Sequence, residues 1–138
     1  MEKFKRGAAF YTVIFLVGGC LYSTVEIIFR GHTHISMLFA GGVCLSLISF
    51  IDRKLRGISF LLKILLCGLV ITAVELIFGL IFNVLLGLNV WNYSGEAFNL
   101  FGQVCLPFSL MWVLISIPAL LLTRLLAEVF YGNYKSTL

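Results

Sequence analysis

The chain alternates long apolar stretches with short polar connections. Apolar residues dominate at about 8–29, 37–51, 58–88 and 100–122, and polar segments separate these stretches. A run of about 20 apolar residues crosses the hydrocarbon core of a bilayer as a helix. The first run is too long for the core of a secretory signal, so we expect it to be retained. The pattern predicts an all-α membrane protein with four transmembrane helices in a single domain, residues 1–138.

Composition and charge support this prediction and orient the chain. Apolar residues make up 61% of the 138 residues and charged residues 12%, against about 25% charged in a typical soluble domain. Nine of the ten basic residues, all but Arg30, gather at the two ends of the chain and around the middle connection: Lys3, Lys5, Arg6, Arg53, Lys54, Arg56, Lys63, Arg124 and Lys135. An even number of spans places all of them on one side, and the positive-inside rule makes that side, with both termini, cytoplasmic. The net charge of +4 is then explained without nucleic acid. Lys63 lies within the third apolar run, so we expect its amine to reach the inner interface.

An internal repeat relates the two halves of the chain. Residues 19–29 read GCLYSTVEIIF and residues 68–78 read GLVITAVELIF, which aligns Glu26 with Glu75. Each half contains two predicted spans, so the halves, at about 8–51 and 58–122, are expected to be parallel helix-pair repeats.

The two aligned glutamates are the main candidates for function. An acidic residue at the centre of a span costs on the order of 3 kcal/mol on insertion scales, so something must offset that cost. Arg30 lies one turn from Glu26 and can pair with it. Gly79 occupies the corresponding place beside Glu75, which leaves three alternatives for that carboxyl group: it is protonated, it shares Arg30, or it binds a cation. Asn83 extends the same helical face.

Small residues accompany the glutamates along these faces. Glycine lets helices approach closely in a membrane, so we expect two packing stripes that face each other or a partner subunit. The candidate packing glycines are Gly19, Gly42, Gly68 and Gly79.

Other polar residues lie near the outer side of the predicted spans. Asn99 and Gln103 are four residues apart at the start of the fourth span, where their amides can bind a solute or tie helices together. Pro107 is expected to kink that span. His32 and His34 are candidate metal ligands, although two ligands without a third donor are too few for a site.

The block WNYSGEAFNLFGQVCLPFSLMW at residues 91–112 resembles the ABC-transporter type IV, or CmpB-like, family of small membrane proteins. The first half resembles the same family where Glu26 is followed by RGHTHISM and a double glycine. The resemblance implies a multi-pass plasma-membrane protein of bacterial origin. The chain departs from the family pattern at Asn92, where aspartate is expected. The matching residues are Glu26, Glu75, Trp91, Tyr93, Ser94, Asn99, Gly102, Gln103, Cys105 and Trp112.

Three functions remain open at this point. The first is a small transport protein or permease-like subunit that moves a solute or ion. Its site would be lined by Glu26, Arg30, Glu75, Asn83, Asn99 and Gln103. The second is a noncatalytic scaffold or partner-binding subunit, and the third is a lipid-acting enzyme that uses the two histidines and a glutamate. No nucleotide loop GxxxxGK[ST] and no serine triad is present, so no cofactor is expected and an enzyme is less favoured. Four helices make a small pathway, so we expect a homodimer or a separate membrane or ATPase partner in the bilayer.

Overall fold

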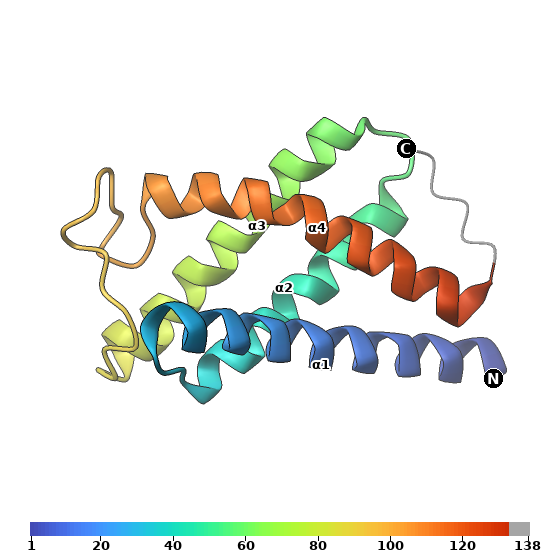
Figure 1. Ribbon diagram of the computed structural model, residues 1–138, viewed down its shortest axis with the longest axis horizontal. Coiled ribbons are helices and arrows are strands. Elements are labelled where there is room, and N and C mark those ends of the chain that lie inside the picture. Colours follow the sequence, from blue (N-terminus) through green and yellow to red (C-terminus); the bar gives the residue numbers. More distant parts are fainter. Residues whose placement is uncertain (133–138) are drawn as a thin grey trace.

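Four long helices and one short π-helical segment form the structure, a computed structural model that describes residues 1–132 (Figure 1). Helix α1 spans Glu2–Arg30, α2 spans Ile35–Lys54 and α3 spans Phe60–Gly79. The π-helix η1, Leu80–Leu85, continues α3, and α4 spans Leu106–Tyr131. All four long helices are long and apolar enough to cross a membrane, which confirms an all-helical protein of four candidate spans.

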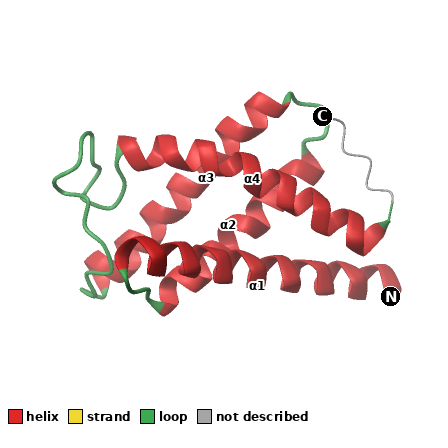
Figure 2. Ribbon diagram, viewed as in Figure 1, coloured by secondary structure: helices red, strands yellow, loops and turns green. Residues whose placement is uncertain are grey.

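Local sequence explains where the helices begin and end. Gly31 adopts a left-handed backbone, φ 76°, and its N–H bonds to the carbonyl of Ile27, which ends α1. His34 caps α2, because its side chain accepts the backbone N–H of Ser36 at 3.2 Å. Ser59 caps α3 in the same way through the N–H of Leu62. The connections between α1 and α2 and between α2 and α3 are therefore short turns (Figure 2).

The fourth helix begins later than the apolar pattern predicts. We expected the span to start near residue 100, but residues 100–105 belong to a long loop, 86–105, that we call the outer loop. Phe98 and Phe101 have φ near +53°, and Gly102 also has a positive φ, so the backbone here is not helical. Pro107 lies in the first turn of α4, where no helical hydrogen bond is lost, so the predicted kink at Pro107 is wrong. The proline inside α4 is Pro118.

Packing follows the order of the chain. Helix α1 packs most extensively against α2, and α3 against α4. The largest core cluster lies between α2, α3 and α4 around Ile48, Cys67 and Leu120. At one end of the molecule α1 also meets α4, where Phe10 packs on the rings of Phe130 and Tyr131.

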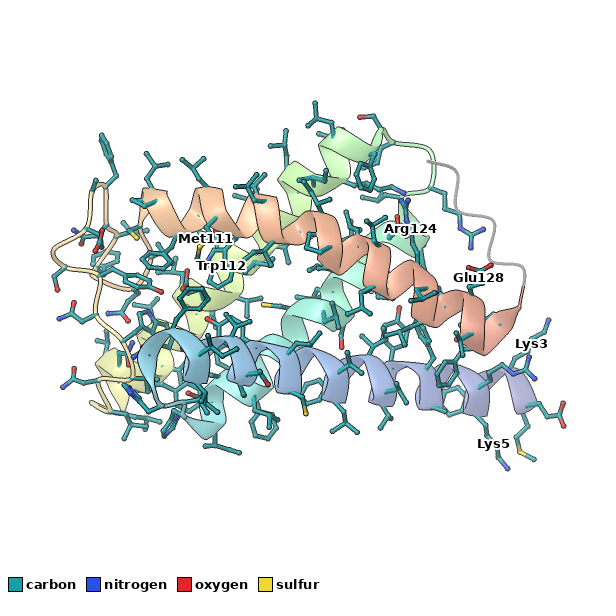
Figure 3. The ribbon with its side chains drawn as sticks, in the orientation of Figure 1. Lys3, Lys5, Met111, Trp112, Arg124 and Glu128 are labelled. Atoms are coloured by element: carbon teal, nitrogen blue, oxygen red, sulfur yellow. The ribbon has the colours of Figure 1, made fainter. Side chains whose placement is uncertain are left out.

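The two ends of the bundle differ in charge. Lys3, Lys5, Arg124 and Glu128 lie toward the same end, opposite the outer loop (Figure 3). The turn between α2 and α3 lies at this end too, as Figure 1 shows. We call it the basic end. Lys135, which the charge pattern assigns to the same side, lies outside the described residues.

Candidate functional site

Glu75 is buried where three separate segments meet. Its side chain extends from α3 and is 7% exposed. Tyr93 of the outer loop donates its hydroxyl to Oε1 at 2.9 Å, and Trp112 of α4 donates its indole N–H to Oε2 at 3.0 Å. Both donors are neutral, and no ion pair to Glu75 forms within residues 1–132. Glu75 therefore does not share Arg30, which pairs with Glu26 instead. Protonation of Glu75 and binding of a cation remain the two alternatives.

Tyr93 is held with its hydroxyl directed at Glu75. Its ring stacks on Phe108 with centroids 4.7 Å apart. Burial, and then the nearby Glu75 carboxylate, raise the pKa of Tyr93 far above its usual range, so the phenol keeps its proton. This hydrogen bond joins the outer loop to the last two turns of α3.

Glu26 has different partners from its aligned counterpart. Arg30 donates Nη1 to Glu26 Oε1 at 2.9 Å, which confirms the predicted ion pair, and Thr33 donates its hydroxyl to Oε2 at 2.8 Å. Arg30 also donates Nη2 to the carbonyl of Val90. The Glu26 cluster therefore ties the end of α1 to the outer loop. Glu26 carries a paired charge, whereas Glu75 is bonded only to neutral groups.

Asn83 and Gln103 form a buried amide network between η1 and the outer loop. Asn83 donates Nδ2 to Gln103 Oε1 at 2.8 Å and to the Trp91 carbonyl at 3.0 Å. Asn83 Oδ1 accepts the N–H of Val90 at 2.6 Å, and Trp91 donates its indole N–H to the Gln103 carbonyl at 2.9 Å. The network fixes the outer loop over the end of α3. Two of the predicted polar residues are thus brought together, although from η1 and a loop rather than from two spans.

Asn99 does not join this network. Its amide donates to the carbonyls of Ser94 and Glu96 at 3.2 and 3.1 Å, and its oxygen accepts the N–H of Gly102 at 3.1 Å. We expected Asn99 and Gln103 on one helical face. Both lie in the outer loop, and Asn99 folds the loop on itself.

The predicted packing glycines lie at close helix contacts within each half. A Cβ at Gly19 would lie 2.6 Å from the Leu38 carbonyl oxygen of α2, and one at Gly68 would lie 2.9 Å from Val113 Cα of α4. A Cβ at Gly42 would meet the Phe15 ring at 2.7 Å, and one at Gly79 would meet Gln103 Oε1 at 2.6 Å. The two stripes therefore pack on the neighbouring helix of their own half or on the outer loop, not on each other.

A buried charge cluster at the basic end was missed by sequence reasoning. Lys63 donates to Asp52 Oδ1 at 2.8 Å, and Arg124 donates Nε and Nη2 to Asp52 at 2.9 and 2.7 Å. The side chains of Asp52 and Lys63 are each 3% exposed, so the Lys63 amine is enclosed against Asp52 and does not extend outward as we expected. The cluster joins α2, α3 and α4. A signal was present, since Asp52 is the one acidic residue in the stretch 50–63.

The histidines have local roles. His34 caps α2, and His32 Nδ1 lies 3.0 Å from the Arg30 carbonyl. Within the described residues, no group of three or more His, Cys, Asp or Glu side chains could hold a metal ion. Within these residues, no Asp or Glu joins His32 and His34 in a possible metal site.

Two hollows share Trp112 as a lining residue. A small cavity of about 10 Å³ touches Glu75 and is also lined by Met37, Phe78 and Trp91. A larger apolar cleft of about 270 Å³ is lined by residues of α1, α2 and α4 and by Ile71 of α3. Trp112 is a wall of both.

These features define a multi-pass membrane protein with a buried polar site near the end of the bundle that carries loop 86–105. The family described as Putative ABC-transporter type IV matches residues 8–137, so the chain belongs to that family, as its sequence resemblance indicated. No curated protein and no solved structure matches the chain.

Proposed function

We propose that this protein is a small membrane transport protein, a permease-like subunit, whose solute or ion site centres on Glu75. Membership of a family described in terms of ABC transport and the four apolar helices both fit a transport-related membrane protein. The observation that carries the proposal is the bonding of Glu75. Its carboxyl group is buried deep in the bundle, yet its donors are a phenol and an indole rather than a cation.

That bonding leaves capacity for a ligand. An ionised carboxylate accepts about four hydrogen bonds, and Glu75 receives two. A charge enclosed without a counter-ion is costly. Binding a proton or a cation from outside the protein would therefore stabilise the ionised Glu75 carboxylate. Glu26 is already balanced by Arg30 and serves in this proposal to position the outer loop beside the site.

The proposed orientation places the basic end and both termini in the cytoplasm. Lys3, Lys5 and Arg124 lie at that end, and the positive-inside rule favours it on the cytoplasmic side. The outer loop then faces the opposite side of a plasma membrane, and the family resemblance supports a bacterial one.

The proposed architecture is two helix-pair repeats. The strong packing of α1 on α2 and of α3 on α4 supports it, as does the alignment of Glu26 with Glu75. Because the sequence contains no nucleotide loop, the energy for transport would come from an ion gradient or a separate ATPase partner. A homodimer would supply the additional helices that a four-helix pathway lacks.

A specific observation favours a second candidate, a noncatalytic scaffold subunit. Both glutamates are hydrogen-bonded within the fold, and the cavity that touches Glu75 measures only about 10 Å³. In a scaffold, these bonds would fix the register of the helices and hold a surface for a partner.

Ion flux through reconstituted vesicles separates the two candidates. Purified protein in liposomes loaded with a pH-sensitive dye would be given a potassium diffusion potential, and proton uptake would be recorded. We expect uptake by the natural protein, its loss in Glu75→Gln, and no change in Glu96→Gln, which alters an exposed loop carboxyl group. Equal leak in all three proteins and in protein-free vesicles would reject an ion path and favour the scaffold.

A further inference from the structure

The apolar cleft opens sideways, toward the bilayer. Helices α1 and α4 touch at the basic end through Phe10 and Phe130, and they diverge toward the outer loop (Figure 1). The cleft lies where they diverge. Val25 of α1 is 46% exposed and Ile115 of α4 is 37% exposed, and both line it. Lipid chains surround this surface in a membrane, so the cleft is reached from hydrocarbon rather than from water.

Two stacked rings line both the cleft and the small cavity that touches Glu75. Tyr22 of α1 and Trp112 of α4 stack with centroids 5.7 Å apart and an interplanar angle of 28°. Cys44 and Ile71 also line both hollows. The indole of Trp112 donates its N–H to Glu75 from this position. Any movement of that ring therefore changes the bonding of the carboxyl group directly.

Other apolar residues complete the lining of the small cavity. Met37, Phe78 and Trp91 line it as well. The Asp52 cluster with Lys63 and Arg124 occupies the opposite end of the bundle. The stacked pair Tyr22 and Trp112 is thus shared by the cleft and by the small cavity that touches Glu75.

The volume and chemistry of this region select a class of ligand. An apolar cavity of about 150 Å³ in another protein takes up benzene, so a cleft of about 270 Å³ accepts a segment of hydrocarbon chain. A helix, which is about 10–12 Å wide with its side chains, is too large for it. The rings of Tyr22 and Trp112 line the cleft, and aromatic faces attract cations. Trp112 is bonded to Glu75, whose carboxylate has no cationic partner among residues 1–132.

The geometry points to a long-chain amine as the ligand: its hydrocarbon chain lies in the cleft between α1 and α4, and its ammonium group passes the Tyr22 and Trp112 rings to reach Glu75. The inference rests on the proposed function, since it names the class of solute for the same carboxylate. The ammonium donates to acceptor positions of the Glu75 carboxylate that Tyr93 and Trp112 leave open, and a charge-assisted hydrogen bond is stronger than a neutral one.

Photochemical labelling in lipid nanodiscs tests the inference. The probes are a long-chain amine that carries a diazirine in its chain and the alcohol of the same chain length, in nanodiscs of phosphatidylcholine. Labelled peptides are identified by mass spectrometry. We expect the amine to label the facing segments 18–25 and 112–122 more strongly than the alcohol does. In Glu75→Gln, labelling by the amine should fall roughly tenfold, to the level of the alcohol, because a bond to a charged group is lost.

A matched pair of variants tests the position of the ligand. Val25→Trp fills the cleft from the lipid side and should block labelling of both segments by the amine. Ile28→Trp makes the same kind of change on the same helix at an exposed position that does not line the cleft, and should leave labelling unchanged.

The outcomes distinguish this inference from the proposed function. Equal labelling by amine and alcohol in the natural protein, or labelling by the amine that Val25→Trp leaves intact, would overturn the amine site. If proton uptake still depended on Glu75, the ion path would survive that result. Labelling that depends on Glu75 without any flux would support the ligand site and reject transport.

Discussion

Replacing Asp52 tests whether the charge cluster at the basic end is buried and stabilising. The Asp52 carboxylate accepts three charge-assisted hydrogen bonds, one from Lys63 and two from Arg124, at 2.7 to 2.9 Å. Its side chain is 3% exposed, and those of Lys63 and Arg124 are 3% and 8% exposed. Asp52→Asn removes the negative charge to which both Lys63 and Arg124 donate.

The expected loss of stability is large. Breaking a buried ion pair by removing one partner costs about 3–5 kcal/mol, and here the buried Lys63 ammonium loses the carboxylate that balances it. The asparagine oxygen still accepts a hydrogen bond, so we expect a loss near 3 kcal/mol in the free energy of unfolding. Replacing all three side chains with apolar ones of similar volume should be close to neutral, because the desolvation cost disappears together with the attraction.

Unfolding in mixed micelles with increasing dodecyl sulfate, followed by tryptophan fluorescence, measures these differences. Glu128→Gln is the matched control, since Glu128 is an exposed carboxyl group of α4 toward the same end, and it should change stability by less than about 0.5 kcal/mol. An Asp52→Asn protein as stable as the control would refute the reasoning and would mean that water reaches Lys63 and Arg124.

Three further changes test the packing and the outer loop. Gly68→Ala places a Cβ 2.9 Å from Val113 Cα, so α3 and α4 must separate, and a loss of about 1–3 kcal/mol is expected in the same unfolding assay; Gly7→Ala, with open space around it, should not destabilise. Asn83→Ala removes three hydrogen bonds to the outer loop, so limited proteolysis within 86–105 should become faster, and unchanged cleavage would contradict the network. Tyr93→Phe leaves Glu75 with its indole donor alone and should cost about 1–2 kcal/mol, whereas a neutral result would mean that this bond does not hold the loop.

The number of helices could be predicted from the sequence, but their outer ends could not. Hydropathy alone marks the four apolar stretches, because the bilayer sets their length. It fails at residues 100–105, where apolar side chains sit on a backbone that turns left-handed at Phe101 and Gly102. Pro107 carried information about this boundary, because proline is favoured in the first turn of a helix.

Partners within the site depend on contacts between distant segments. The pair Glu26 and Arg30 is local, four residues apart on one helix, so its spacing predicts the ion pair. Glu75 bonds to Trp112, 37 positions along the chain, and no periodicity in a single sequence encodes that contact. The same limit applies to Asp52 and Arg124, which are 72 positions apart.

A structure of the protein in lipid nanodiscs, at a resolution that shows ordered water and bound molecules, tests most directly whether Glu75 is a binding site. We predict that Tyr93 and Trp112 donate hydrogen bonds to Glu75. We also predict a further group, which is a water, a cation or an amine, bound to the same carboxyl group. A dry site in which protein side chains alone satisfy both glutamates would contradict the transport proposal and support the scaffold.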